Sequence, residues 1–287
     1  QVGIHLKSLE EAEALMPRET EIYSSQFQKR RIVKAYTTPA LIQLEEELIG
    51  KLAETSGKCA NIFSERTIER VIQDADQESV SLGYEGWNAE QKSVTRGLLT
   101  SKDQITGLQG YAGTAKTSTV LKAISYAYSE KGYEVIGMAP SSSACESLKH
   151  GAGLDSARTV ASHLLQSEYQ RLQAKNQLWL IDEASLLSSK DTLKLFRQAV
   201  KQNAKVILVG DAKQLGSIEA GAAFRQLQEA GMQTHQLTEI VRQENKYALD
   251  AVYSTIDANA ERALDILTQG PSKVIIAPES SKERYRH

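Results

Sequence analysis

The sequence predicts an α/β protein, in which a parallel sheet is covered by helices on both faces and is preceded by a small, mainly helical domain. Short apolar runs alternate with amphipathic stretches from about residue 105 onward, as they do in successive βαβ units. A glycine-rich loop follows the first of these runs, and two later runs are followed by acidic residues. Because sheets of this kind bind ligands at the carboxyl ends of their strands, we expect these motifs to meet at one edge of the sheet.

The N-terminal part contains two predicted helices. Thr38 can cap a helix that Pro39 opens, and apolar residues then recur at spacings of three and four over residues 41–52. A second amphipathic helix is expected from Thr67 to about Ala75. The stretch from Glu21 to Tyr36 is compatible with an extended piece, but its pattern does not assign it.

A domain boundary is expected where the chain becomes polar and glycine-rich, between Ser79 and Gly86. The mainly helical domain then spans residues 1–78, and the sheet domain spans residues 79–287. Within the sheet domain the predicted strands are Ile105–Gln109, Glu134–Ala139, Leu178–Ile181, Val206–Val209 and Gln233–Leu237. The predicted helices between them are Thr117–Ser129, Ser143–His150, Thr159–Tyr169, Lys190–Val200 and Ala222–Glu229.

The composition is typical of a soluble globular protein. Hydrophobic residues make up 41% and charged residues 24% of the 287 residues, as in soluble globular proteins, and no apolar run is long enough to predict a membrane span. Cys59 and Cys145 are the only cysteines, which favours a reducing compartment and hence the cytoplasm. The net charge of −2 argues against DNA binding through bulk positive charge, although a local basic groove is still possible.

The most specific motif is the segment Gly-Tyr-Ala-Gly-Thr-Ala-Lys-Thr at residues 110–117. It follows a predicted strand and opens a predicted helix, which is the context of a phosphate-binding loop. Unpaired N–H groups and the helix dipole attract anions there. We therefore expect a P-loop NTPase that binds ATP and Mg²⁺, with Lys116 at the β- and γ-phosphates and Thr117 on the metal. The remaining expected nucleotide contacts in the loop are Gly110, Ala112, Gly113, Thr114 and Ala115.

Ala115 stands where this motif has its last glycine. An alanine methyl is tolerated there if the backbone is near-helical, and we expect Gly113 to supply any positive φ. A glycine-rich turn that binds no ligand is the alternative interpretation of the segment.

A second motif follows the apolar run Leu178–Ile181, which ends in Asp182 and Glu183. Asp182 is expected to hold Mg²⁺ through water, and Glu183 to orient and deprotonate the water that attacks the γ-phosphate. The alternative is an acidic pair that caps the next helix, which is a common arrangement.

A third motif, Gly-Asp-Ala-Lys-Gln at residues 210–214, follows the run Val206–Val209. Because a glutamine amide both donates and accepts hydrogen bonds, Gln214 is a candidate sensor of the γ-phosphate. The dipeptide Gly-Asp is also common in ordinary turns, so this motif by itself is weak evidence for a γ-phosphate sensor.

Together these motifs resemble the superfamily 1 DNA helicases of the 5′-to-3′ branch, and in particular the helicase region of conjugative relaxase-helicases. The resemblance covers roughly Tyr84 to Leu267 and implies a RecA-like ATP-binding domain, the first of two in the parent protein. Residues 87–91 are similar to the family's adenine-reading motif, which implies that Gln91 pairs with the adenine edge. Residues 237–243 resemble a later motif, which implies that Arg242 reaches the γ-phosphate.

Two further segments resemble DNA-contacting motifs of the same family. Residues 138–144 imply DNA contacts, and residues 159–164 imply a base-stacking contact from His163. The DNA contacts implied in the first segment are Pro140, Ser141, Ser142 and Ser143. Their residue types allow a plainer interpretation, because serines cap helices and His163 lies on an otherwise apolar stretch, where it can be a core histidine.

The resemblance implies an ATP-dependent 5′-to-3′ helicase or translocase that acts on single-stranded DNA in plasmid conjugation. Its implied partners are single-stranded DNA, the rest of the parent relaxase-helicase chain and the conjugation machinery. No basic motif is recognised after Arg242, so the second motor domain is expected to be largely outside this chain, and the ATPase by itself to be weak. A DNA-repair helicase subunit of the exonuclease type is one alternative, and a non-catalytic DNA-binding or transfer-signal module that retains a P-loop is another.

Overall fold

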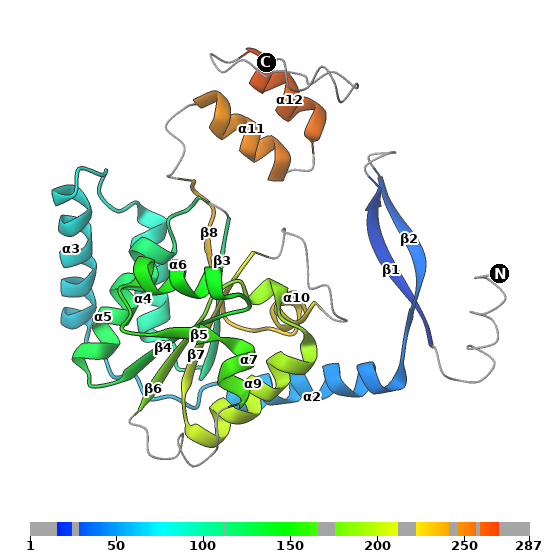
Figure 1. Cartoon of the computed structure of the whole chain (residues 1–287), viewed down its shortest axis with the longest axis horizontal. Helices are drawn as coiled ribbons and strands as arrows, with labels where there is room; N and C mark the ends of the chain where they lie inside the picture. The colour runs from blue at the N-terminus through cyan, green and yellow to red at the C-terminus, as the bar shows by residue number, and fades with distance from the viewer. Residues whose placement is uncertain are drawn as a thin grey trace.

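A six-stranded parallel sheet forms the centre of the structure (Figure 1). The computed structural model describes residues 16–24, 29–111, 113–165, 176–211, 222–240, 246–256 and 259–269. The strand order is β5-β4-β6-β7-β3-β8, and every neighbouring pair in this sheet is parallel. The strands of this sheet are β3 (Ile105–Gly110), β4 (Glu134–Ala139), β5 (Ala157–Thr159), β6 (Gln177–Ile181), β7 (Lys205–Gly210) and β8 (Thr234–Leu237). The prediction of an α/β fold is confirmed, and β5 is the one described strand of this sheet that the sequence did not predict.

Alternating side chains of the central strands feed two apolar clusters, one on each face of the sheet. In β6, Leu178 and Leu180 belong to one cluster, whereas Trp179 and Ile181 belong to the other. This is the period of two expected for a strand that is buried on both faces. The first cluster contains residues of α3 (Glu65–Ser81), α4 (Ala89–Thr100), α5 (Lys122–Glu130) and α6 (Ser142–Ala152), and the second contains residues of α2 (Pro39–Thr55), α9 (Ser189–Gln202) and α10 (Ala223–Glu229).

The helices that cover the two faces include each one that the sequence predicted. Their bounds are α2 (Pro39–Thr55), α3 (Glu65–Ser81), α4 (Ala89–Thr100), α5 (Lys122–Glu130), α6 (Ser142–Ala152), α7 (Val160–Leu165), α9 (Ser189–Gln202) and α10 (Ala223–Glu229). A π-helical turn, η1 (Thr117–Leu121), precedes α5, and a 3-10 turn, η2 (Ala184–Leu186), follows β6. The predicted helix Thr159–Tyr169 is described only as far as Leu165.

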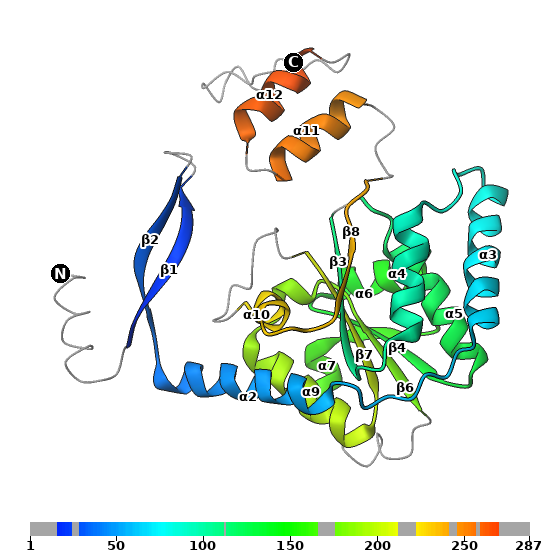
Figure 2. The same ribbon diagram turned by 180° about the vertical axis from the view of Figure 1, so that it is seen from behind.

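The first described residues form an antiparallel pair of strands, β1 (Met16–Ser24) and β2 (Lys29–Thr37). The stretch 21–36 that the sequence left unassigned is therefore largely extended (Figures 1 and 2). The Thr38 side chain accepts the N–H of Leu41, and Pro39 is the first residue of α2, as predicted.

The two helices that follow the hairpin pack against the sheet domain. Leu48 of α2 lies in the same apolar cluster as Phe196 of α9, and Ile68 of α3 lies in the same cluster as Leu98 of α4. The predicted division after residue 78 falls inside α3, one turn before its end. Residues on both sides of that division thus share the core, and we propose that α2 and α3 belong to the sheet domain.

Beyond β8, two helices contact one another, α11 (Lys246–Ile256) and α12 (Ala260–Gln269). The sequence did not predict either of them. Among the helices that the structure describes, none combines the length and the apolar character that a membrane crossing requires.

Candidate active site

The segment after β3 turns sharply before η1 begins. Gly113 has a φ of 87° and Ala115 a φ of 55°. The expectation that Gly113 supplies positive φ is confirmed. The condition of a near-helical backbone at Ala115 is not met, because this alanine lies in the left-handed region, which costs an L-residue about 1–2 kcal/mol.

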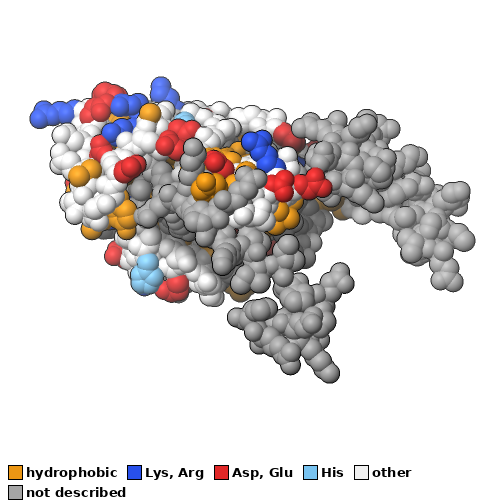
Figure 3. Space-filling model, turned by 90° about the horizontal axis from the view of Figure 1, so that it is seen from above, with side chains coloured by type: hydrophobic (Ala, Val, Ile, Leu, Met, Phe, Trp, Pro, Cys, Tyr) orange, Lys and Arg blue, Asp and Glu red, His pale blue; other side chains and the backbone are white. Residues whose placement is uncertain are grey.

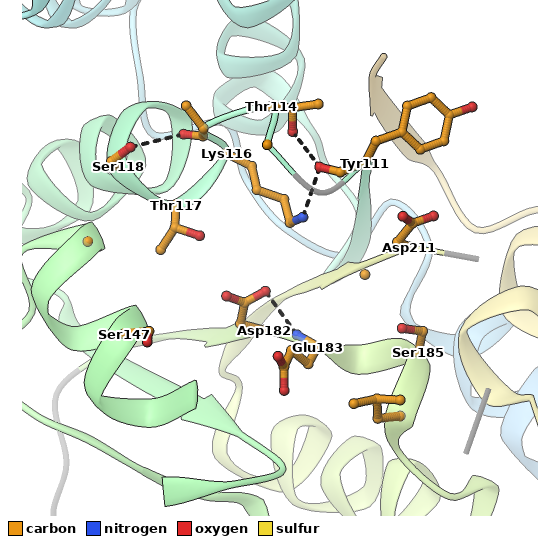
Figure 4. A pocket seen from close by; sticks show the side chains of 15 residues that line it. Tyr111, Thr114, Lys116, Thr117, Ser118, Ser147, Asp182, Glu183, Ser185 and Asp211 are labelled. Atoms are coloured by element: carbon orange, nitrogen blue, oxygen red, sulfur yellow. Dashed lines mark hydrogen bonds between the residues drawn. The ribbon is translucent and has the colours of Figure 1, made fainter. Parts of the chain in front are cut away.

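Lys116 extends back along the loop. Its Nζ donates to the carbonyl oxygens of Gly110 at 3.0 Å and Tyr111 at 3.4 Å, and the Thr114 hydroxyl donates to the Tyr111 carbonyl at 3.0 Å. Figure 4 shows the Lys116 side chain reaching into the cleft, while the Tyr111 ring points away from it. The ammonium is thus placed where an anion in the loop would meet it.

Asp182 follows the last residue of β6 and lies across the cleft from Thr117 (Figure 4). Burial raises the pKa of the Asp182 carboxyl, and this effect is partly offset by the Glu183 N–H, the charge of Lys116 and a hydrogen bond from Thr117. The Glu183 N–H donates to Oδ1 of Asp182 at 2.9 Å. The phosphate-loop hydroxyl and the strand-end carboxylate therefore come together, as the motifs predicted.

Glu183 is also in the left-handed region, with a φ of 52° and a ψ of 35°. Burial raises the pKa of its carboxyl, the neighbouring Asp182 raises it further, and Lys116 lowers it. Its side chain is nevertheless exposed at the cleft. A strained backbone that holds an exposed carboxylate of raised pKa is typical of a group that accepts a proton.

The three motifs line one cleft with a volume of about 400 Å³. It lies at the carboxyl ends of β3, β6 and β7, as expected for a parallel sheet. Its described lining is Tyr111, Gly113, Thr114, Ala115, Lys116, Thr117, Ser118, Ser147, Gly151, Asp182, Glu183, Ser185, Leu186, Gly210 and Asp211.

Several lining residues were not predicted from the sequence. Ser147 and Gly151 come from α6, four residues apart and hence on one face of that helix. Asp211 is buried and accepts a hydrogen bond from Nε2 of Gln109 at 2.9 Å. The sequence held no clear signal for Gly151, because a glycine inside a helix can also have nothing near it, as Gly50 of α2 does.

The oxygen atoms at the cleft fit a hydrated Mg²⁺ ion. Mg²⁺ prefers oxygen ligands, keeps several waters, and is usually held by one or two carboxylates together with substrate phosphates. Thr117 and Asp182 supply one hydroxyl and one carboxylate to the same cleft. Within the described ranges, no group of three or more His, Cys, Asp or Glu residues could hold a metal ion.

Gln91 lies in the first turn of α4 and has partners within the protein. Its Oε1 accepts the Asn88 N–H at 3.0 Å, while its own N–H donates to Oδ1 of Asn88 at 2.8 Å. Its Nε2 also donates to the Thr119 hydroxyl at 3.4 Å. The side chain is buried, so the structure places Gln91 in a capping box, and its pairing with adenine stays a prediction.

The residues predicted to contact DNA have different environments. Ser141, Ser142 and Ser143 are exposed and Pro140 is partly exposed, at the end of β4. Ser141 is the N-cap of α6, because its side chain accepts the N–H of Ala144 at 3.2 Å. Capping and DNA contact are compatible for an exposed serine, so the DNA contacts stay a prediction.

His163 has to be reassigned. Only 1% of its surface is exposed, and its ring meets the edge of Trp179 with centroids 4.6 Å apart. A nucleotide base has no access to a side chain in this position. The plainer of the two interpretations, a core histidine, is the one that the structure supports.

Three of the predicted site residues lie outside the described residues. They are Ala112, Gln214 and Arg242.

Comparison with known proteins gives matches of several kinds. Residues 86–272 match the AAA domain family. A probable conjugal transfer protein TraA of Sinorhizobium fredii is 32% identical over 231 residues, which are 80% of this chain and 20% of that protein. The multifunctional conjugation protein TraI of Escherichia coli is 32% identical over 212 residues, which are 69% of this chain and 12% of that protein. The crystal structure of the Pif1 helicase from Candida albicans aligns with a TM-score of 0.49 and 19% identity, over 67% of this chain and 49% of that one.

The chain thus spans a fifth or less of the length of these two curated relatives. The family match includes β3 to β8 and the cleft-lining residues of all three motifs. The resemblance to conjugative transfer proteins that the motifs indicated is confirmed by the sequence matches. The chain belongs to the AAA domain family and is related in sequence to the conjugal transfer proteins TraA and TraI.

Proposed function

We propose that this chain is the ATP-hydrolysing motor domain of a DNA helicase that moves 5′-to-3′ along single-stranded DNA during plasmid conjugation. The observation that carries the proposal is the meeting of Lys116, Thr117 and Asp182 in one cleft at the carboxyl edge of the sheet, with Glu183 beside them. The sequence relationship to conjugal transfer proteins supports the biological setting.

In this proposal, groups of the protein bind ATP, orient the attacking water and accept its proton. The loop N–H groups and Lys116 bind the phosphates of ATP. Thr117 and Asp182 hold Mg²⁺, which when bound neutralises charge on the β- and γ-phosphates. Glu183 orients a water in line with the γ-phosphate and takes its proton. Gln91 at the adenine, with Gln214 and Arg242 at the γ-phosphate, complete the proposed set.

We propose that DNA lies near the N-terminus of α6, at Pro140 and the exposed serines 141–143. Figure 3 shows Lys and Arg lying beside Asp and Glu on the described part of the face seen from above, rather than a continuous basic surface. Many basic side chains of α3 to α5 are already paired, for example Lys122 with Glu78 at 2.6 Å. We therefore expect few phosphate contacts, with a slope of log affinity against log salt near −0.7 for each one.

Nucleotide binding is tested by calorimetry with Mg-ATP and Mg-ADP. Lys116→Ala should weaken binding severely, because it removes the cation at the phosphates. Lys190→Ala is the matched control, since Lys190 is an exposed lysine outside the cleft, and it should bind like the wild type. Equal ATP affinity in the wild type and Lys116→Ala would refute the assignment of the loop.

Hydrolysis and direction need separate measurements. Glu183→Gln should bind ATP about as well as the wild type and turn over far more slowly, because a base contributes about 10²–10⁴-fold to rate. Unchanged turnover would place the base elsewhere.

In the whole protein, a duplex with a 5′ tail should be unwound in preference to one with a 3′ tail, and the reverse preference would contradict the proposed direction.

A further inference from the structure

A continuous series of hydrogen bonds leads from the phosphate-binding loop into the first turn of α4. The Thr119 hydroxyl donates to the Ala115 carbonyl at 2.7 Å and accepts from Nε2 of Gln91 at 3.4 Å. The reciprocal bonds between Gln91 and Asn88 hold this turn of α4 together. A shift of the loop at Ala115 would therefore reach the start of α4 through one hydroxyl and one amide.

Glu90, the neighbour of Gln91, holds the segment that leaves the sheet after β8. Its Oε2 accepts the N–H groups of Thr238 at 2.7 Å and Glu239 at 3.0 Å, and its Oε1 accepts the Thr238 hydroxyl at 2.5 Å. Bonds to an ionised acceptor are about twice as strong as bonds between neutral groups. Burial raises the pKa of Glu90, but these donors outweigh burial, and the pKa is lowered overall.

The series continues from this segment to α11. The Ile240 N–H donates to the Tyr253 hydroxyl at 3.1 Å, and that hydroxyl donates to the Thr238 carbonyl at 3.5 Å. Ile240 itself is buried, which fixes the segment between its two polar anchors. A carboxylate on α4 and a hydroxyl on α11 thus both hold the segment 238–240 where it leaves the sheet.

We propose that Glu90 is a positioning residue through which the segment 238–240 follows the state of the phosphate-binding loop. The proposal rests on the proposed function to the extent that a nucleotide must bind in the loop. When phosphate engages the loop N–H groups, the Ala115 carbonyl shifts, Thr119 and Gln91 follow, and the rigid first turn of α4 moves Glu90 with its three donors. The segment 238–240 and α11 then respond to nucleotide through Glu90.

The experiment is amide hydrogen exchange at residues 238–240 with and without Mg-ADP. In the wild type, Mg-ADP should slow exchange at these amides about fivefold or more, the lower end of typical coupling between sites. Thr119→Val and Thr238→Val each remove one hydroxyl of the series at nearly constant shape, so each should reduce this effect of Mg-ADP. Glu90→Ala should abolish it. Thr100→Val is the matched control, since its hydroxyl donates to the carbonyls of Arg96 and Gly97 in its own helix, and it should respond like the wild type.

The double variant Thr119→Val/Thr238→Val distinguishes a connected series from separate structural damage. If the two hydroxyls act in series, the second substitution adds little to the first, whereas independent effects would multiply. If Glu90→Ala binds Mg-ADP normally and Mg-ADP still slows amide exchange at residues 238–240 as in the wild type, the inference is overturned while the proposed function stands. Absence of Mg-ADP binding to the wild type by calorimetry would overturn the proposed function and the inference together.

Discussion

Two residues at the cleft, Ala115 and Glu183, adopt backbone conformations that suit glycine better. Their φ values of 55° and 52° place both in the left-handed region. One carries the loop carbonyl that meets Thr119, and the other carries the proposed base. Strain of this kind persists at functional sites because the surrounding structure holds it in place.

The strain at Ala115 leads to a prediction about stability. Ala115→Gly should raise the free energy of unfolding by about 0.5–1 kcal/mol, because relief of left-handed strain outweighs the added freedom of the unfolded chain. Ala53→Gly, at an exposed position inside α2, should instead lower it by about 1 kcal/mol. Urea unfolding of both variants checks the pair, and a destabilised Ala115→Gly would contradict the conformation described for this residue.

The buried charge at Asp182 leads to a second prediction. Its pKa is raised in the folded chain, so the group favours folding below its ordinary pKa and opposes folding as the pH rises through the raised value. Asp182→Asn should therefore stabilise the nucleotide-free chain at neutral pH by about 0.5–2 kcal/mol, as removal of a destabilised functional group often does. It should at the same time reduce the Mg²⁺ dependence of nucleotide binding.

Thermal unfolding across pH tests this prediction. The difference between Asp182→Asn and the wild type should be largest near neutral pH, should shrink as the pH falls through the raised pKa, and should be gone below the ordinary pKa of aspartate. A difference that grew on acidification would mean that the pKa of Asp182 is lowered in the folded chain.

At the scale of elements, α6 and η1 approach each other closely through a glycine. A Cβ built on Gly151 would lie 2.9 Å from Cγ2 and 3.4 Å from Cβ of Thr117. Gly50 in α2 has nothing within 4 Å of the same position. Substitution of Gly50 by alanine therefore measures helix propensity alone, whereas substitution of Gly151 also measures the effect of the contact with Thr117.

The contact predicts opposite effects for two chemically identical substitutions. Gly50→Ala should stabilise the chain by about 0.5–1 kcal/mol. Gly151→Ala should displace Thr117 and weaken Mg-ADP binding by about tenfold, which corresponds to about 1.4 kcal/mol. Calorimetry with Mg-ADP on both variants checks this. Unchanged binding in Gly151→Ala would mean that η1 moves aside at no cost to the metal site.

Most elements were predictable because their patterns are local. β3, β6 and β7 are fully buried runs, and the caps at Thr38 and Ser141 are read directly from residue type. The helix α4 was missed because the polar residues Gln91 and Thr95 lie on its buried face, where they interrupt the apolar stripe. β5 was missed because three residues carry no measurable period.

The part of the site that could be predicted is the part formed by motifs that directly follow a strand. The carboxyl edge of a parallel sheet brings such residues together without further information. For His163 the sequence left a base-stacking contact and a core histidine both open, because the contact that distinguishes them is with Trp179, on a different element of the sheet domain. The role of Glu90 was hidden for the same reason, since its partners lie 148 and 149 residues away.

At the scale of the whole molecule, the segment before residue 79 contributes to the apolar clusters on both faces of the sheet. Phe63, Ile68, Val71 and Ile72 are at most 5% exposed and belong to the cluster on one face. Leu48, wholly buried, belongs to the other. Each such side chain contributes about 1.5–3 kcal/mol, and a domain is stable by only about 5–15 kcal/mol.

This packing predicts the result of truncation. A chain that begins at residue 79 should fail to show a cooperative unfolding transition, because both clusters lose part of their cover. A chain that begins at residue 38 keeps α2 and α3 and should unfold cooperatively. Circular dichroism during heating compares the two, and a cooperative transition in the shorter chain would restore the division after residue 78.

The position of β3 between β7 and β8 also sets the order of events during synthesis. Ile105 pairs with Val206, and Gly107 pairs with Thr234, so neither neighbour of the strand exists when the strand itself leaves the ribosome. At about 5–20 residues per second, the gap between the strand and its first neighbour lasts roughly 5–20 s. Until then the nascent chain has an exposed apolar strand beside an unformed phosphate loop, so chaperones are expected to bind this segment early, and nucleotide can favour the native pairing only after β7 has emerged.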